Sequence, residues 1–429
     1  MEPMRHVLIV CYDFPRLDAA GVIRVYQLMK GLIGCGWQPV VMTAQPCNTG
    51  VVHDIEASDG ELPCPKVTVT GRLFSAGTES ASRTVAAVDE NPLPRAGKSP
   101  ARYARQLAVP DGKVGWILPA VRRGLEIGRV YSFDLCFSTS PRPTAHFVGR
   151  RLARRLKIPW VADFALPWSD AHWLADRPQM IGWLDRRLER SLVRSARHIT
   201  VAYGDIARSI SARFGRALEQ RMSVIPTGFS EDLFDGSEPQ RPGKFTVVYP
   251  GNHFCEQGRK GSRFLEAVDQ WLASAPCLKD QIEFVFIGKR DEELLRCRAA
   301  MRHPEAVRIK EIISHRECVA AIRSSHACLV NAVGNRIPGK IYECLRAGKP
   351  ILALAEPGSA LDVIIRRYSR GVAVPADDKE AIVRALRRVY SEEGARMIKT
   401  TECGGPLARH DAARSAESLA RVFDGALGS

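Results

Sequence analysis

Short apolar runs alternate with amphipathic stretches through most of this 429-residue chain. Continuous runs such as Val7–Tyr12 and Ile351–Leu354 are typical of strands buried on both faces, as in parallel sheets. The stretches between such runs place apolar residues three or four positions apart, as helices do. Strand, helix and strand in this repeated order predict an α/β chain with parallel, doubly wound sheets.

The alternation falls into two series that are separated by a polar segment. Pro239–Lys244 (PQRPGK) has no apolar face, which is typical of a linker between domains. A chain of 429 residues also exceeds what one ordinary core accommodates. We therefore expect an N-terminal Rossmann-like domain over 1–238, a second over 239–400, and a C-terminal helical segment over 401–429 that packs back on the first domain.

One segment of the first series lacks the alternation. Residues 46–110 are rich in Ser, Thr, Gly, Pro and Ala, with only short apolar pieces such as Val67–Val69. A loop of this length inside a compact domain is usually functional or disordered. We expect a long, partly mobile insertion with a helix near Tyr103–Ala108.

The cysteines and the apolar runs indicate a cytoplasmic protein. The twelve cysteines form no C-x-x-C pair and no Cys/His cluster at zinc spacing. No segment approaches the eighteen or so apolar residues of a membrane span. We expect neither a disulfide framework nor a structural zinc site.

The net charge is the strongest deviation in the composition. A formal charge of +15 implies an anionic partner, which is a nucleic acid, a phosphate-bearing small molecule or an acidic membrane face. No recognised nucleic-acid module or aromatic stacking platform accompanies the charge, which disfavours the first of these.

The stretch from Val333 to Gly358 predicts a ligand crevice. A Gly/Pro-rich loop leads into a short helix near Lys340, Gly348 provides a left-handed stop, and a buried strand follows. Lys340 and Glu343 are three positions apart, on one face of the first helical turn. The pair is either a solvated ion pair or part of a binding site, and the spacing alone leaves both readings open.

Other loops follow the strands of the second series. Arg259 and Lys260, among small residues before a helix, are suited to cradle a diphosphate, although an ordinary polar loop would look the same. Glu343 is suited to accept the hydroxyl protons of a ribose. Gly21, at the start of the first helix, allows an anion near the helix N-terminus, but the G-x-G-x-x-G pattern of dehydrogenases is absent.

Seven segments, in the same order, resemble those of the retaining GT-B glycosyltransferases of family four. This family includes sucrose synthases and many bacterial polysaccharide and lipopolysaccharide enzymes. The segments are HVLIVCYDFPRLDAAGVIRVYQLMKGL, VPDGKVGWILPAV, FDLCFSTSPRPTAH, IPWVADFALPWS, VIPTGFSEDLF, VVYPGNHFCEQG and PGKIYECLRAGKPILALAEPGS. The resemblance implies a GT-B fold, in which two doubly wound Rossmann-like domains face each other across a cleft.

The resemblance also implies an activity. Such enzymes are hexosyltransferase-type enzymes that move a sugar from a UDP-, GDP- or dTDP-sugar to an acceptor hydroxyl, without a metal or a further cofactor. Polysaccharide, lipopolysaccharide or other glycoconjugate biosynthesis is the expected setting. Positive groups on the leaving diphosphate stabilise the transition state in such reactions.

Carried over position by position, the resemblance implies specific residues. Glu343 matches the second glutamate of the family's pair, which holds the nucleotide ribose, whereas Asn335 stands at the place of the first. The expected donor site comprises Gly21, Gly251, Asn252, Arg259, Lys260, Gly288, Lys289, Ile312, Asn335, Gly339, Lys340 and Glu343. The expected catalytic residues are Asp163, His172 and Lys260, and no metal ligands are expected.

The segment VADFALPWS departs from the family pattern. Ala165 and Leu166 replace the arginine and the aspartate of the common Asp-Phe-Arg-Asp-Pro-Trp sequence. Together with Asn335, this departure motivates an alternative: a catalytically silent GT-B homologue that serves as a partner or regulatory subunit. A GT-B epimerase fits the N-terminal segments less well.

Two basic amphipathic segments, Arg150–Lys157 and Leu184–His198, bear on the acceptor. In relatives with lipid acceptors such helices lie on the anionic cytoplasmic leaflet, while the alternative is a solvated helix face. We expect a sugar or lipid-linked acceptor, peripheral contact with an anionic membrane, and a location in the cytoplasm at the inner face of the membrane.

Overall fold

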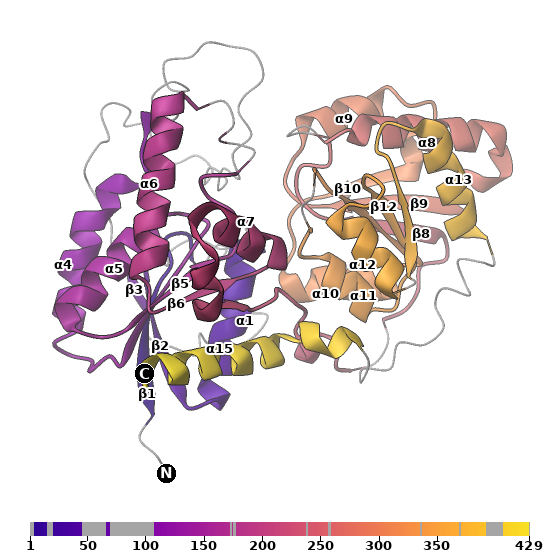
Figure 1. Ribbon diagram of the computed structural model, residues 1–429. Helices are drawn as coiled ribbons and strands as arrows, with labels where there is room; N and C mark the ends of the chain where they lie inside the picture. Colours follow the sequence, from indigo (N-terminus) through magenta and orange to yellow (C-terminus); the bar gives the residue numbers. More distant parts are fainter. Residues whose placement is uncertain are drawn as a thin grey trace, which may run out of the picture. The chain divides into compact units, whose positions relative to one another are not determined.

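The computed structural model describes residues 4–14, 20–44, 66–68, 107–171, 174, 177–236, 239–255, 259–334, 337–368, 370–391 and 406–428. The chain forms two compact units (Figure 1). Unit 1 comprises Met1–Thr227 with Ala412–Ser429, and unit 2 comprises Gly228–Asp411. The division falls at Thr227, so the polar segment Pro239–Lys244 belongs to unit 2.

Unit 1 is built on a parallel sheet with the strand order β3-β2-β1-β4-β5-β6-β7. Side chains alternate across this sheet: Val7 and Ile9 pack in one core cluster, and Leu8 and Val10 pack in another. Both faces are therefore apolar, which explains the continuous apolar runs. The strands are β1 (Arg5–Val10), β2 (Trp37–Thr43), β3 (Lys66–Thr68), β4 (Leu135–Thr139), β5 (Trp160–Phe164), β6 (His198–Val201) and β7 (Met222–Val224).

Helices cover both faces of the unit 1 sheet. One core cluster joins α1 (Ala20–Gly34) and α15 (Ala412–Leu427) to the face that carries Val7. The ring of Phe423 on α15 lies 5.1 Å from that of Trp37, so α15 contributes to the unit 1 core. The other cluster draws on the remaining helices, which are α4 (Ile117–Ile127), α5 (Thr144–Leu156), α6 (Gln179–Ser195) and α7 (Gly204–Phe214).

Unit 2 is built on a parallel sheet with the strand order β10-β9-β8-β11-β12-β13. The strands are β8 (Phe245–Pro250), β9 (Ile282–Ile287), β10 (Val307–Lys310), β11 (Ala327–Asn331), β12 (Ile351–Leu354) and β13 (Gly371–Val374). The helices are α8 (Gly261–Ser274), α9 (Glu292–Ala299), α10 (His315–Ser324), α11 (Ile341–Arg346), α12 (Ala360–Tyr368) and α13 (Lys379–Tyr390). The expected fold class, two doubly wound Rossmann-like halves, is confirmed.

The insertion over 46–110 lies mostly outside the described residues, and so does most of the helix expected near Tyr103–Ala108. Lys66–Thr68 forms a strand that pairs with β2 at the sheet edge. The sequence did not predict this strand, because three residues are too few to show an alternation.

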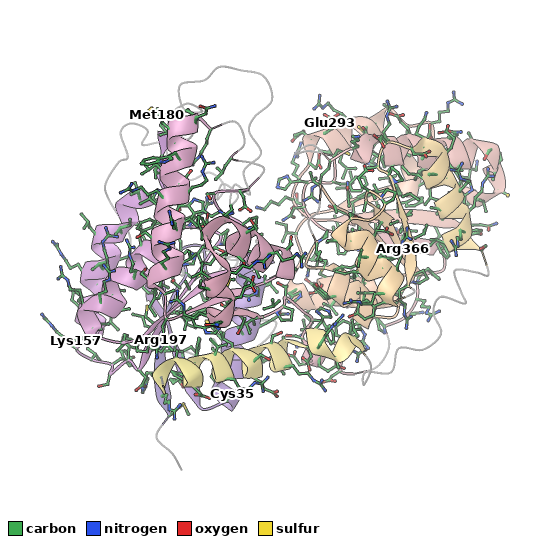
Figure 2. All side chains as sticks on the ribbon, viewed as in Figure 1. Cys35, Lys157, Met180, Arg197, Glu293 and Arg366 are labelled. Atoms are coloured by element: carbon green, nitrogen blue, oxygen red, sulfur yellow. The ribbon has the colours of Figure 1, made fainter. Side chains whose placement is uncertain are left out.

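Among the described residues, no helix is both long enough and apolar enough to cross a bilayer. The longest described helix of unit 1, α6, carries charged residues along its length (Figure 2). Met180 marks the start of α6 in that view, and Arg197 lies two residues beyond its end.

Candidate functional site

The strand order of unit 2 defines a switch point between β8 and β11. Strands on one side of this point follow one another in one direction, and strands on the other side follow in the opposite direction. The loops after β8 and β11 therefore diverge, which opens a crevice at the carboxyl ends of these strands. Ligands of open α/β sheets bind in such crevices.

Arg259 lies directly at this switch point. Its Nη1 donates hydrogen bonds to the hydroxyl of Tyr249 on β8 and to the carbonyl oxygen of Asn331 on β11, each over 3.2 Å. Its Nε is buried and has no hydrogen-bond partner among the described residues. Asn331 donates from Nδ2 to the carbonyl of Phe254 over 3.0 Å, so the end of β11 is tied to the loop after β8. A guanidinium held by two adjacent strands is a fixed positive charge in the crevice.

Four other expected residues come together beside Arg259. A Cβ on Gly288 would lie 2.4 Å from the carbonyl oxygen of Gly251, so the loops after β8 and β9 pack backbone to backbone. Asn252 accepts a hydrogen bond at Oδ1 from the backbone nitrogen of Lys289 over 2.8 Å. Only a glycine at position 288 permits this approach.

Lys260 points elsewhere. Its ammonium forms an ion pair with Asp377, a residue of the loop between β13 and α13, and both side chains are more than half exposed. The hydrogen bond to Asp377 raises the pKa of Lys260 above its ordinary value. In this arrangement Arg259, and not Lys260, is the cation that lies at the switch point.

Helix α11 brings Glu343 to the crevice. The helix ends as the sequence predicted, because Gly348 adopts a left-handed φ of 68°. The nitrogen of Gly348 donates to Leu345 O over 3.0 Å, and that of Lys349 donates to Cys344 O over 3.3 Å. This pair of hydrogen bonds is a Schellman motif, which stops the helix after its second turn.

The carboxylate of Glu343 is buried between two basic side chains. Its Oε1 lies 2.6 Å from Nε2 of His315, and its Oε2 lies 2.9 Å from Nζ of Lys340. Burial alone would raise the pKa of Glu343, but Lys340 and His315 outweigh burial and lower the pKa to about 2. Glu343 is only 3% exposed, so the reading of the Lys340–Glu343 pair as a solvated surface pair is wrong.

One oxygen of this carboxylate retains its acceptor capacity. Among the described residues, Oε2 of Glu343 receives no well-directed hydrogen bond, although the ammonium of Lys340 lies close to it. An ionised carboxylate that is held by an ammonium and an imidazole and has a remaining lone pair is suited to accept hydrogen bonds from a diol.

For the other expected donor-site residues, the structure gives a place in the chain but, among the described residues, no hydrogen bond to Arg259 or Glu343. Gly339 belongs to the turn that opens α11, Ile312 is 48% exposed in the loop between β10 and α10, and Gly21 lies in the first turn of α1. Asn335 and His172 lie outside the described residues. Within the described part of the chain, no group of three His, Cys, Asp or Glu side chains is placed to hold a metal ion.

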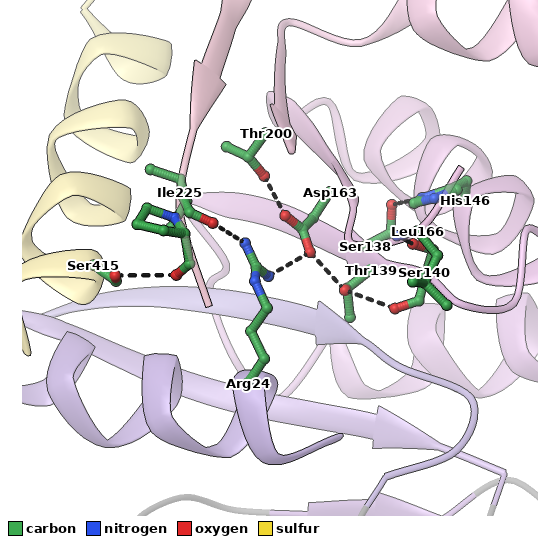
Figure 3. A network of polar contacts seen from close by, with 11 residues as sticks. Arg24, Ser138, Thr139, Ser140, His146, Asp163, Leu166, Thr200, Ile225 and Ser415 are labelled. Carbon is green, nitrogen blue, oxygen red and sulfur yellow. Dashed lines mark hydrogen bonds and ion pairs between the residues drawn. The ribbon is translucent and has the colours of Figure 1, made fainter. Parts of the chain in front are cut away.

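Asp163, at the end of β5, is the hub of a buried polar network in unit 1 (Figure 3). Its Oδ2 accepts from Nη1 of Arg24 and from Oγ1 of Thr139, and its Oδ1 accepts from Oγ1 of Thr200, each over 2.7 Å. The residue is 0% exposed. Asp163 thus holds α1, β4 and β6 together, and both of its oxygens are engaged in this structure.

His146, in the first turn of α5, lies near this network and is fully buried. The hydroxyl of Ser138 accepts from Nε1 of Trp160 over 2.8 Å and lies 2.9 Å from Nδ1 of His146. Among the described residues, Nε2 of His146 has no hydrogen-bond partner. Burial lowers the pKa of His146 to about 4, so the imidazole is neutral at physiological pH.

Sequence reasoning missed two residues of the unit 2 crevice. His315 is the first residue of α10, behind a capping box formed by Ser314 and Glu317. Asn331 is the polar residue that ends the apolar strand β11. Both stand at the carboxyl ends of strands or just beyond them, and this position was the signal that would have found them.

Comparison with known protein families identifies the chain. A model described as "Glycosyl transferase 4-like domain" matches residues 21–228, and one described as "Glycosyl transferases group 1" matches residues 244–392. The chain belongs to the GT-B glycosyltransferases of the family-four type. A search of curated proteins finds no match.

Solved structures of GT-B proteins share the fold over nearly the whole chain. HepE of Anabaena, in complex with UDP and glucose, is 12% identical over 98% of this chain and 100% of its own, with a TM-score of 0.68. Sucrose-phosphate synthase of Thermosynechococcus elongatus is 14% identical over 99% and 96%, with a TM-score of 0.60. UDP-GlcNAc 2-epimerase of Methanocaldococcus jannaschii is 11% identical over 98% and 99%, with a TM-score of 0.56. These likenesses concern the fold alone.

The buried His146 gives a testable pH dependence. Its pKa is about 4 in the folded protein and about 6.5 in an unfolded chain, so between these values only the unfolded chain binds the proton. The contribution of neutral, buried His146 to the free energy of unfolding of unit 1 should be at its maximum above pH 6.5. It should fall by roughly 3 kcal/mol toward pH 4, because protonation stabilises the unfolded chain. Hydrogen exchange of the β4 and β5 amides from pH 7 to 4.5 measures it. The difference between wild type and His146→Gln should shrink as the pH falls, and a constant difference contradicts the assignment.

Proposed function

We propose that this protein moves a sugar from a nucleotide-sugar to an acceptor hydroxyl, with retention of the anomeric configuration. The observation that carries the proposal is the buried, ionised Glu343 at the first turn of α11, beside the switch point of unit 2. A carboxylate in this position is suited to accept both hydroxyls of a nucleotide ribose. Family membership supports a hexosyltransferase-type reaction in polysaccharide, lipopolysaccharide or other glycoconjugate biosynthesis.

The leaving diphosphate would lie toward Arg259. This guanidinium is fixed at the end of β11, and the close packing of Gly288 on Gly251 holds the loops after β8 and β9 together. Asn252, Lys289 and the first turn of α8 flank the same loops. Cations and backbone N–H groups stabilise the charge that develops on the diphosphate, and they do so without a metal. Lys260 would join them by exchanging Asp377 for a phosphate oxygen.

Asp163 supports this reaction indirectly. Because both of its oxygens are engaged by Arg24, Thr139 and Thr200, we assign it a positioning role at the carboxyl ends of β4, β5 and β6. The loop that follows β5 is held in the same region, because the backbone nitrogen of Leu166 donates to Oγ of Ser140 over 3.3 Å. A protein base is less important in retaining transfer than stabilisation of the leaving group.

Binding of the donor is tested first by thermal unfolding. UDP, GDP and dTDP, with UDP-glucose as a first sugar donor, should raise the melting temperature for at least one base, because ligands that bind only the folded state stabilise it. Glu343→Ala should abolish the shift, since it removes the ribose acceptor and leaves Lys340 and His315 without their partner. Glu266→Ala, at an exposed ion pair of α8, is the matched control and should retain it. If no nucleotide shifts the wild type, the donor site is wrong.

Transfer itself separates the enzyme from a catalytically silent homologue. The alternative, a partner or regulatory subunit, is favoured by Ala165 and Leu166, which stand where relatives carry charged residues. Incubation with radiolabelled nucleotide-sugars and a membrane extract should label an acceptor, and Arg259→Met should lower the rate at least tenfold. Nucleotide binding with no labelled product from any donor would favour the silent homologue.

We further propose that unit 1 docks on an anionic membrane to reach a lipid-linked acceptor. Exposed arginines follow the outer sides of α5 and α6, and Met180 and Trp183 protrude at the start of α6 with exposed fractions of 83% and 55%. The guanidinium of Arg187 lies over the ring of Trp183 at 5.4 Å. Arginines with an interfacial tryptophan suit anionic headgroups, at about 1 kcal/mol per basic residue near the surface.

Vesicle binding tests the docking surface. Wild-type protein should co-sediment with vesicles of phosphatidylglycerol and phosphatidylethanolamine, and the triple reversal Arg187→Glu, Arg190→Glu and Arg194→Glu should weaken this more than tenfold. The matched control reverses three exposed arginines of α13, Arg384, Arg387 and Arg388, with the same change in net charge. Equal losses for both triple variants would mean that net charge, and not the α6 face, determines binding.

A further inference from the structure

The loop that follows β5 reaches the crevice of unit 1. The strand order of unit 1 reverses between β1 and β4, so the loops after these two strands diverge there. The backbone nitrogen of Leu166 donates to Oγ of Ser140, the first residue after β4, over 3.3 Å (Figure 3). Leu166 and Pro167 are both partly exposed. The loop after β5 therefore places two apolar side chains beside the switch point of unit 1.

Trp168 fixes the middle of this loop. The residue is only 4% exposed and packs in the core cluster on one face of the unit 1 sheet. Its ring lies 6.2 Å from that of Phe147 on α5, in an edge-to-face arrangement. A buried tryptophan contributes a large apolar contact area, so the chain is held firmly from the residue that follows Pro167.

Ser169 is held by a buried carboxylate of α6. Its backbone nitrogen and its hydroxyl both donate to Oε2 of Glu189, the nitrogen over 3.2 Å. Glu189 is 1% exposed, and Nη1 of Arg213 on α7 lies 2.6 Å from the same oxygen. Nη1 of Arg213 also donates to the hydroxyl of Ser169 over 2.7 Å. Glu189, Arg213 and Ser169 thus contact one another directly, and they join the loop to two helices.

Arg213 also holds the next residue of the loop. Its Nη2 lies 3.2 Å from Oδ1 of Asp170, and its Nε donates to Oγ of Ser209 over 3.1 Å. The hydroxyl of Ser209 in turn donates to Asp170. The planar fork of a guanidinium fixes the directions of its partners as well as their distances.

Helix α6 is itself fixed by a second buried carboxylate, one turn before Glu189. Asp185 is 1% exposed and forms an ion pair with Arg177, whose Nη2 donates to the carbonyl oxygen of Ala108 over 3.1 Å. A buried ion pair often stabilises a fold no more than apolar packing would, because burial removes the hydration of both charges. Two such carboxylates behind one loop therefore suit a role in geometry rather than in stability.

We propose that Glu189 and Arg213 are positioning residues that hold Leu166 and Pro167 as an apolar contact for the acceptor. The proposal rests on the proposed transfer reaction. The loop carries Ala165 and Leu166 where relatives carry charged residues, so the acceptor meets an apolar surface here and binds it with an apolar portion. Transfer requires the acceptor hydroxyl in one defined position, and a displaced loop would lose that position.

The test measures transfer kinetics in the full chain. The nucleotide-sugar that labels a product serves as donor, and a dilution series of the solubilised membrane extract serves as acceptor. Glu189→Gln removes the charge behind the loop, and Ser169→Ala removes only the hydroxyl of the loop. Glu219→Gln is the matched control. Glu219, in the short helix η3 (Arg216–Arg221), also accepts from a serine of α7, Ser211, and among the described residues it has no hydrogen bond to the loop.

Glu189→Gln should raise the apparent KM for the extract at least roughly fivefold, and it should leave the KM for the nucleotide-sugar within about twofold of wild type. The reason is that the variant loosens the acceptor contact in unit 1 and leaves the donor site in unit 2 intact. Ser169→Ala should act in the same direction with a smaller effect. Leu166→Asp, which places a charge on the apolar contact, should raise the KM for the extract as well. Glu219→Gln should keep both constants.

A merely structural role would give a different result. If Glu189→Gln lowers kcat or the melting temperature while the KM for the extract keeps its wild-type value, the positioning role is overturned. If Glu189→Gln does not fold, an unaltered KM in Ser169→Ala overturns it. An unaltered KM in Leu166→Asp overturns the apolar contact. Absence of any labelled product with the wild type would overturn the proposed transfer reaction itself, and this inference with it.

Discussion

A buried carboxylate is stable only when its charge is paired, and two such groups organise this protein. In unit 1, Asp163 uses both oxygens to bind Arg24, Thr139 and Thr200, which fixes the ends of three strands and one helix. In unit 2, Glu343 is paired by His315 and Lys340, yet Oε2 keeps acceptor capacity. Both oxygens of Asp163 accept hydrogen bonds, whereas one oxygen of Glu343 receives no well-directed hydrogen bond among the described residues.

The fold alone does not decide the reaction. Structures of a synthase and of a UDP-GlcNAc 2-epimerase resemble this chain about equally well, so the function must be argued from the site. We propose that Arg259 at the switch point meets the diphosphate of the nucleotide and that Glu343 on α11 meets its ribose.

Local sequence patterns predicted the helices and strands well, because a buried strand or an amphipathic helix produces a recognisable pattern of apolar residues within one short segment. Gly348 as the stop of α11 followed from the same local reading, whereas the spacing of Lys340 and Glu343 left open whether the pair is solvated or part of a binding site. The pairing of side chains across loops did not: His315 reaches Glu343 over 28 positions, and Lys260 meets Asp377 over 117. The closed network around Asp163 was likewise invisible, since its partners come from three separate elements.

We propose that Glu343 accepts the ribose hydroxyls of the donor nucleotide. The most direct measurement compares the affinity of the nucleotide that binds best with that of its analogue without ribose hydroxyls, in wild type and in Glu343→Ala. Loss of hydrogen bonds to a charged acceptor should weaken the analogue by roughly tenfold or more in wild type. Glu343→Ala should bind the two ligands equally, and much more weakly than the wild type binds the nucleotide. Equal affinities in the wild type would contradict this role of Glu343.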